Sequence, residues 1–211
     1  MHCKSFFELY LPKVSDPKDF VKSENSIQLS VTEPLFKDPK VIAVDGGMPP
    51  HKVDYWIGDG DSGDIPLKPT LLLSQDKDFS DLAATLNFIS DNFQGPFFIK
   101  IFHALGGRRD HEIINREEIF YFLKSHQGII STEPECIFFN IPVCLNFPIS
   151  LFFSLYTSNF PTSLDIKGAR YSGTVTLTRP SHGLSNYPLG SEVKIDPRGN
   201  PVGLICSHEK I

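Results

Sequence analysis

Four short candidate strands, each followed by a segment rich in Gly, Asp or Ser, constrain the fold of this 211-residue chain most strongly. They lie at residues 41–44, 53–57, 70–73 and 97–102. Short apolar runs that stop at turn residues are typical of buried parallel strands. Apolar residues at helical spacing predict helices over 79–93 and 111–125. Strands that alternate with helices through short connections predict an α/β fold with a Rossmann-like parallel sheet.

The C-terminal part of the chain has a different pattern. Candidate strands at 149–156 and 170–177 precede a predicted hairpin, in which the turn sequence PRGN joins strands 193–195 and 202–205. No helical period is evident after about residue 130. The sequence therefore predicts an α/β domain at 1–130 and a smaller, all-β sandwich domain at 131–211. Residues 1–40 contain one further candidate strand, at 6–11, whose periodicity is mixed.

The net charge of −5 is confined to residues 41–81, where eight Asp stand against three Lys, while the rest of the chain is neutral. This charge argues against a general binder of nucleic acid or of anionic membranes. None of the eight acids is Glu, although a solvated face normally mixes Asp with Glu. The cluster therefore indicates a functional site.

The segment GDGDS at 58–62 places Asp59 and Asp61 on a loop flanked by glycines. Two short carboxylates in this arrangement can hold a hard divalent cation such as Mg²⁺, and Asp81 can supply a third oxygen ligand. The alternative is a turn in which Asp and Gly serve only the backbone geometry. The segment alone does not decide between the two.

The segment GGR at 106–108 follows a candidate strand and precedes a candidate helix. Glycines allow close backbone approach, a helix N-terminus favours anions, and Arg can bind phosphate oxygens through two hydrogen bonds. Two Gly in a row also make simple tight connections. There is no nucleophile elbow, complete P-loop or dinucleotide fingerprint. These observations favour metal-assisted transfer of a phosphate-containing group.

Five segments taken together, and in this order, resemble the thiamine pyrophosphokinase family. They are DGG at 45–47, GDGDS at 58–62, QDKDFSD at 75–81, GGRRDH at 106–111 with Asn115, and GLSN at 183–186. The resemblance implies transfer of the pyrophosphoryl group of ATP to the hydroxyl of thiamine, giving thiamine diphosphate and AMP. It further implies a homodimer with active sites at the interface, in which residues 1–130 bind ATP and Mg²⁺ and residues 131–211 bind thiamine.

The resemblance also implies roles for individual residues. Asp59, Asp61 and Asp81 look like the catalytic, Mg²⁺-binding carboxylates. The residues that look like ATP contacts are Gln75, Lys77, Ser80, Gly106, Gly107, Arg108 and Asp110. Those that resemble thiamine contacts are Asp45, Tyr171, Ser185 and Asn186.

Two other functions stay open from the sequence. One is a pyrophosphokinase that acts on another alcohol, such as a hydroxymethyl-pterin, and the other is a non-catalytic nucleotide-binding module. The four Cys form no CxxC pair, which favours free thiols in a reducing compartment. No apolar stretch approaches the ~20 residues of a membrane-spanning helix. We therefore expect a cytoplasmic protein.

Overall fold

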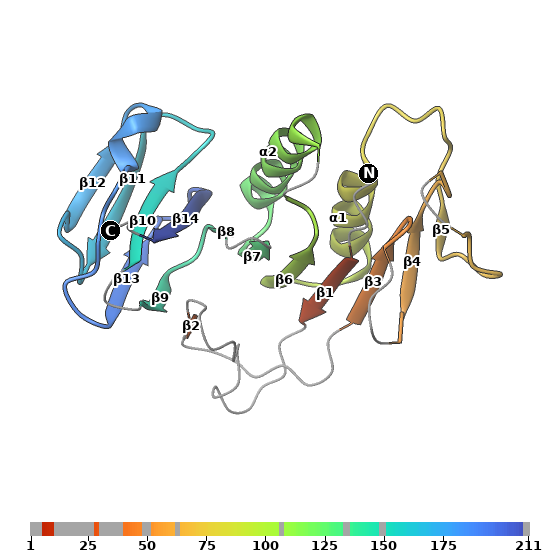
Figure 1. The fold of residues 1–211 in the computed structure, drawn as a ribbon, viewed down its shortest axis with the longest axis horizontal. Helices are drawn as coiled ribbons and strands as arrows, with labels where there is room; N and C mark the ends of the chain where they lie inside the picture. Colours follow the sequence, from red (N-terminus) through yellow and green to blue (C-terminus); the bar gives the residue numbers. More distant parts are fainter. Residues whose placement is uncertain are drawn as a thin grey trace.

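The computed structural model describes residues 6–10, 28–29, 40–47, 52–61, 64–105, 108–132, 136–147 and 151–208, which form two sheets, two α-helices and a short 3₁₀-helix (Figure 1). In spatial order, the nine-stranded sheet contains β10 (Leu151–Tyr156), β14 (Val202–His208), β8 (Cys136–Phe139), β7 (Gly128–Thr132), β6 (Phe97–Phe102), β1 (Phe6–Tyr10), β3 (Lys40–Val44), β4 (Tyr55–Gly58) and β5 (Leu71–Leu72). The five-stranded sheet contains β12 (Gly173–Leu177), β11 (Thr162–Lys167), β13 (Glu192–Asp196), β9 (Val143–Asn146) and β2 (Gln28–Leu29).

The large sheet is mixed, and β1 interrupts the parallel order that the sequence predicted for residues 1–130. β3, β4 and β5 run parallel to one another, as do β6 and β7. β1 lies between these two groups and is antiparallel to both β3 and β6. The prediction missed this arrangement because β1 pairs with strands that lie far along the chain. Since β1 opposes both neighbours, β3 and β6 run in the same direction and end at the same edge of the sheet.

The two predicted helices are confirmed as α1 (Asp81–Asn92) and α2 (Arg109–Ser125), which pack against each other. Ser80 caps α1, because its Oγ accepts a hydrogen bond from the backbone N–H of Ala83 at 3.1 Å. The apolar faces of both helices share one core with alternate residues of the large sheet. The members of this core include Ile42, Ile57, Leu86, Ile89, Ile99, Ile119, Leu123, Ile130 and Phe138. This packing places the N-termini of the helices beside the strand ends that precede them.

A second core lies between the β8–β14–β10 end of the large sheet and the five-stranded sheet. Its fully buried members include Phe139, Phe153, Leu164, Val193 and Leu204. The predicted hairpin is wrong, because β13 pairs with β11 and β9 while β14 pairs with β10 and β8. The PRGN turn instead carries the chain from one layer to the other, through left-handed conformations at Arg198 (φ 54°) and Gly199 (φ 81°).

Hydrogen bonding in the large sheet continues across residue 130, from β6 through β7, β8 and β14 to β10. Strands from both predicted domains therefore share this sheet, and the division into 1–130 and 131–211 stays a prediction. In the described part of the chain, no helix has the length and apolar character needed to cross a lipid bilayer. No disulfide joins Cys136, Cys144 and Cys206 to one another in the described part of the chain, and Cys3 lies outside it.

Candidate active site

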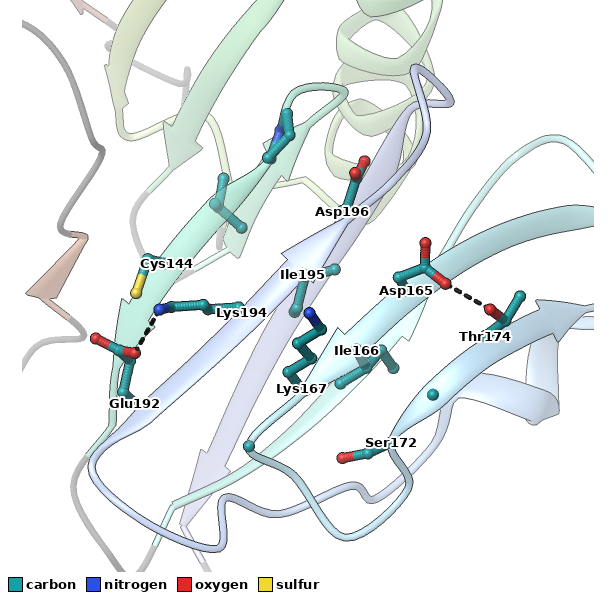
Figure 2. Close-up of a pocket in the computed structure, with 14 residues that line it drawn as sticks. Cys144, Asp165, Ile166, Lys167, Ser172, Thr174, Glu192, Lys194, Ile195 and Asp196 are labelled. Carbon is teal, nitrogen blue, oxygen red and sulfur yellow. Dashed lines mark hydrogen bonds and ion pairs between the residues drawn. The ribbon is translucent and has the colours of Figure 1, made fainter.

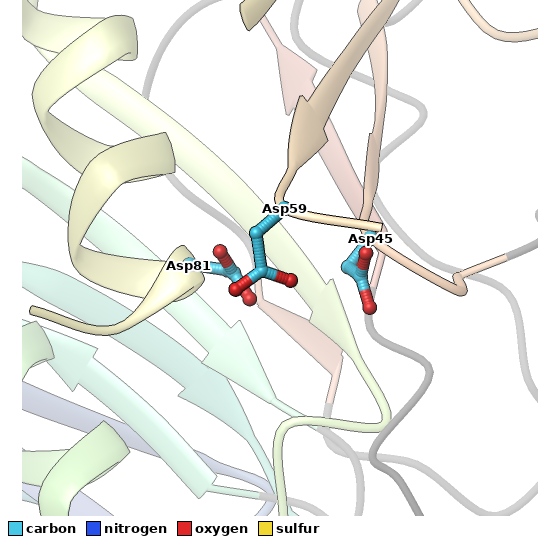
Figure 3. Close-up of side chains that lie close together, drawn as sticks. All are labelled: Asp45, Asp59 and Asp81. Carbon is cyan, nitrogen blue, oxygen red and sulfur yellow. The ribbon is translucent and has the colours of Figure 1, made fainter. Parts of the chain in front are cut away.

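Three aspartates converge at the sheet edge where β3 and β4 end and α1 begins (Figure 3). Asp45 directly follows β3, Asp59 directly follows β4, and Asp81 is the first residue of α1. Each offers a carboxylate oxygen, and these oxygens lie within 4.8 Å of one another. We call Asp45, Asp59 and Asp81 the acid group. Carboxylate oxygens gathered in this way are the ligands that hard divalent cations prefer.

The backbone after β3 holds Asp45 tightly in place. Asp45 is 6% exposed, and its backbone has a left-handed conformation with φ 47°. Its backbone N–H donates to the carbonyl of Ile57 at 2.8 Å, and its carbonyl accepts from Trp56 Nε1 at 3.0 Å. Its Oδ1 accepts from the backbone N–H of Gly60 at 2.8 Å. The sequence placed Asp45 among the thiamine contacts, and the structure places it with the predicted metal ligands.

Asp61 does not join the acid group. Its backbone N–H donates to Asp59 Oδ1 at 3.1 Å, and the residue is exposed. The turn therefore presents the Asp59 carboxylate to the acid group and leaves Asp61 exposed. The role of Asp61 as a metal ligand stays a prediction.

Lys77 forms ion pairs with two members of the acid group. Its Nζ contacts Asp59 Oδ2 and lies 3.2 Å from Asp81 Oδ1. Burial disfavours the charged ammonium group, but the two carboxylates outweigh it and raise the pKa of Lys77. Burial also opposes the charge of Asp59, yet contact with Lys77 lowers the pKa of Asp59 below its ordinary value. The sequence suggested Lys77 as an ATP contact but did not predict these ion pairs.

Asp81 has an incompletely satisfied carboxylate. Its Oδ1 is buried and makes no hydrogen bond among the described residues, although Lys77 Nζ lies nearby. Burial raises the pKa of Asp81, and Lys77 offsets this effect only in part. A buried carboxylate oxygen without an aligned donor is costly, and a bound cation is one way to satisfy it. The residues present therefore fit a divalent metal ion.

The connection from β6 to α2 is described only in part, because Gly106 and Gly107 lie outside the described residues. Arg108 occupies the N-cap position of α2 and binds Asp110 through Nε at 3.2 Å and Nη2 at 2.5 Å. Hydrogen bonds from the Arg108 guanidinium lower the pKa of Asp110 to about 2. Asn115 Nδ2 donates to the carbonyl of Ala104 at 2.8 Å and thereby fixes the end of this connection. Arg108 is exposed, and its guanidinium pairs with the carboxylate of Asp110. A guanidinium can pair with the oxygens of a phosphate group in the same way.

The two other predicted ATP contacts lie on either side of Lys77. Gln75 is exposed in the turn that follows β5, and Ser80 is the N-cap of α1. The Ser80 hydroxyl accepts the capping hydrogen bond, so its observed role is structural. Both residues lie in the segment that joins β5 to α1, next to the acid group.

The predicted thiamine contacts Tyr171, Ser185 and Asn186 lie together beside β10. Asn186 is 5% exposed, and its side chain accepts from the Tyr171 N–H and donates to the Tyr171 carbonyl, both at 3.0 Å. Asn186 also pairs through its backbone with Phe153 of β10, and the backbone N–H of Ser185 donates to Ser154 Oγ. Asn186 therefore holds the Tyr171 backbone, while Tyr171 as a whole residue is 56% exposed.

We call Tyr171, Ser185 and Asn186 the Tyr171 cluster. This cluster is remote from the acid group within one chain. β10 forms one edge of the large sheet, and six strand spacings separate it from β3 (Figure 1). At about 4.8 Å per spacing, the separation is roughly 30 Å along the sheet. One chain therefore does not bring Tyr171 to Asp59.

A groove of about 920 Å³ lies on the outer face of the five-stranded sheet (Figure 2). Several of its charged side chains are paired with partners from the same sheet region. Lys194 contacts Glu192 at 3.0 Å, and Asp165 binds Arg198 and Thr174. The groove contains none of the acid group, which is the only set of three or more potential metal ligands found among the described residues. The acid group is therefore the stronger candidate for a catalytic site.

No protein-family model matches this sequence, and no curated protein matches it significantly. The structure does match solved thiamin pyrophosphokinases. The enzyme from Geobacillus thermodenitrificans aligns with a TM-score of 0.59 and 17% identity, over 80% of this chain and 86% of that one. The enzyme from Bacillus subtilis aligns with a TM-score of 0.59 and 19% identity, over 80% and 87%. The one from Candida albicans aligns with a TM-score of 0.54 and 11% identity, over 75% and 74%.

The chain has the thiamin pyrophosphokinase fold. The resemblance read from the sequence motifs is therefore confirmed at the level of the fold. At these identities the likeness establishes fold alone, so the activity is argued from the residues at the site.

Proposed function

We propose that this protein transfers the pyrophosphoryl group of ATP to the hydroxyl of thiamine, giving thiamine diphosphate and AMP. The observation that carries the proposal is the convergence of Asp45, Asp59 and Asp81 at the carboxyl edge of the strands in a thiamin pyrophosphokinase fold. Ligands of open α/β sheets bind at this edge. Phosphoryl-type transfer depends mainly on positioning and charge stabilisation, which such a site can provide.

The acid group would hold Mg²⁺, and Asp61 on the adjoining turn is a further candidate ligand. A divalent cation held by these carboxylates would supply positive charge to neutralise the negative charge that develops on the transferred group. The support is the donor set of short carboxylates, together with the buried Oδ1 of Asp81, which has the Lys77 ion pair but no aligned hydrogen bond within the described part of the chain. Asp45 and Asp59 are fixed by backbone N–H donors, so these two carboxylates are oriented before the metal binds.

The N-terminal end of α2 would bind the phosphates of ATP. Arg108 can exchange Asp110 for a phosphate group, since both present paired oxygens to the guanidinium. The helix N-terminus adds its positive dipole end. Gly106, Gly107 and Gln75 complete the proposed ATP contacts.

We further propose that the protein works as a homodimer with shared sites. The support is the separation of roughly 30 Å between β3 and β10, at about 4.8 Å per strand spacing. If the Tyr171 cluster binds thiamine, a second chain must place it near the acid group. An exposed Tyr ring could stack on the cationic thiazolium of thiamine.

The experiment is an assay of purified protein with ATP, Mg²⁺ and either thiamine or a hydroxymethyl-pterin, with detection of AMP and the diphosphorylated product by mass spectrometry. AMP and thiamine diphosphate are the expected products. The Asp59→Asn variant is the inactive control, because it removes one carboxylate charge with little change in shape.

Two outcomes would overturn the proposal in favour of the alternatives. Formation of AMP with the pterin alone would indicate a pyrophosphokinase with another acceptor. Tight binding of ATP without AMP formation would indicate a nucleotide-binding module. The cytoplasmic location stays a prediction, which imaging of a tagged protein in its native cells would test.

A further inference from the structure

Lys77 places a positive charge against two of the three carboxylates that would hold a metal ion. Its Nζ contacts Asp59 Oδ2 and is 3.2 Å from Asp81 Oδ1. The Lys77 side chain is only 10% exposed, although a lysine on a loop normally extends into solvent. The long side chain is therefore held inward, inside the acid group.

An ammonium group and a divalent cation compete for these oxygens. Oxygen ligands approach Mg²⁺ to about 2.1 Å, so the ion needs direct access to the carboxylates. Two positive charges side by side in a partly buried site also repel each other strongly. A cation that binds Asp59 and Asp81 therefore displaces the Lys77 ammonium group.

Lys77 satisfies the acid group only in part. One ammonium group pairs with two of the three carboxylates, and the Asp81 Oδ1 atom that it contacts at 3.2 Å receives no well-aligned hydrogen bond from the described residues. A permanent structural ion pair normally satisfies its buried oxygens. This geometry suits an ammonium group that occupies the site until a divalent cation replaces it.

We propose that Lys77 is a displaceable counter-ion of the metal site. It neutralises Asp59 and Asp81 when no metal is bound, and metal binding releases its ammonium group to the phosphates of the nucleotide. Lys77 is thus a positioning residue that makes metal and nucleotide bind cooperatively. The nucleotide part rests on the proposed function, whereas the competition between Lys77 and the metal rests on the observed ion pairs alone.

The first test uses the wild-type protein and acylation of lysine amines, read by mass spectrometry with and without Mn²⁺. Lys77 is expected to react several-fold faster when Mn²⁺ is bound, because the released ammonium group becomes accessible. Adding a non-hydrolysable ATP analogue should suppress the reaction again. Lys68, an exposed lysine in the same acidic segment, is the internal control and should be unaffected. No change in Lys77 labelling on Mn²⁺ binding would overturn the proposal.

The second test compares Mn²⁺ affinities by electron paramagnetic resonance, without thiamine. Without nucleotide, Lys77→Met is expected to bind Mn²⁺ roughly tenfold more tightly than wild type, a typical size for coupled sites. With saturating Mn²⁺, it is expected to bind the ATP analogue roughly tenfold more weakly. Lys68→Met should leave both affinities unchanged. Equal or weaker Mn²⁺ binding by a folded Lys77→Met variant would contradict the competition.

The two proposals can fail separately. If wild-type protein binds Mn²⁺ but makes no thiamine diphosphate, the proposed function fails and the Mn²⁺ affinities still decide the role of Lys77. If wild-type protein binds no divalent cation, both proposals fall. If Lys77→Met does not fold, as judged by circular dichroism, the labelling of wild-type Lys77 decides.

Discussion

Gly58 allows the ends of β3 and β4 to approach each other closely, and the position of Asp45 depends on this approach. A Cβ at residue 58 would lie 2.6 Å from Asp45 Cα and 2.9 Å from its backbone nitrogen. These are backbone atoms, so no side-chain rotation can relieve the clash. The GDGDS segment thus supplies more than carboxylates: Gly58 provides space, and Gly60 donates to Asp45.

At this residue scale, Gly58→Ala should destabilise the protein by about 1–3 kcal/mol, the usual cost of overpacking. It should also weaken Mn²⁺ binding, because Asp45 must move. Urea unfolding and Mn²⁺ titration measure the two effects. Gly190→Ala is the matched control, since a Cβ there meets nothing within 4 Å. Equal stability of the two variants would contradict the close approach.

Asp59 and Asp61 should differ as ligands, although the sequence treats them alike. Asp59→Asn removes a member of the acid group and should abolish measurable Mn²⁺ binding. Asp61→Asn should weaken it much less, because Asp61 is exposed and outside the group. If both variants lose Mn²⁺ affinity equally in a titration, the set of metal ligands predicted from the sequence, which includes Asp61, would be supported instead. Spacing along a turn could not predict this difference, since φ and ψ decide which carboxylate points inward.

At the scale of elements, local sequence patterns predicted the helices and most strands, but not which strands pair with one another. The helical period placed α1 and α2 within two residues of their observed ends, because amphipathic packing is a local signal. The strand β1 was ambiguous because Glu8 interrupts its apolar run, and its direction depends on strands far along the chain. The PRGN segment predicted a turn correctly, but the residues of a turn do not determine which sheet the next strand joins.

Arg116 links α2 to two strands of the large sheet. Its Nη1 donates to Tyr156 Oη in β10 at 3.0 Å and lies 3.4 Å from Cys136 Sγ in β8, while Glu112 pairs with its Nη2 at 2.8 Å. Burial raises the pKa of Tyr156, and Arg116 offsets this only in part. Burial likewise raises the pKa of the Cys136 thiol. Burial therefore keeps Tyr156 neutral in the folded protein, although the contact with Arg116 acts in the opposite direction.

The raised pKa of Tyr156 makes stability sensitive to alkaline pH. The folded state keeps the phenol proton above the ordinary tyrosine pKa of about 10, where the unfolded state loses it. The contribution is fully present below that pH and is lost as the pH rises further. The free energy of unfolding should fall more steeply above pH 10 in wild type than in Tyr156→Phe, measured by urea unfolding. Tyr121→Phe, at an exposed position, should behave as wild type, and identical slopes for all three would refute the effect.

At the scale of the whole molecule, the acid group and the Tyr171 cluster lie toward opposite ends of the large sheet (Figure 1). Motif order in the sequence listed both as parts of one site. Their separation depends on how many strands enter the sheet between them, which no single motif records. The roles of these residues, and the sharing of each site between two chains, stay predictions.

Shared sites predict recovery of activity when two inactive variants are mixed. Asp59→Asn and Tyr171→Ala should each lose most activity, because each damages both sites of its own homodimer. A heterodimer keeps one intact site of two, so purified heterodimers of a symmetric dimer should show about half of the wild-type rate, and an unpurified random mixture about a quarter. The measurement is thiamine diphosphate formation by separately tagged, co-purified heterodimers. No recovery in verified heterodimers would argue against sites at the interface.

β1 hydrogen-bonds both to β3, which leads to the acid group, and to β6, which leads to Arg108 and α2. Within the described ladder, these two functional ends are joined through this five-residue strand. A slip of two residues in the register between β1 and only one of these neighbours would preserve the face of every side chain and yet shift one end against the other by about 7 Å. The register of β1 against β3 and β6 thus sets the distance between the acid group and Arg108.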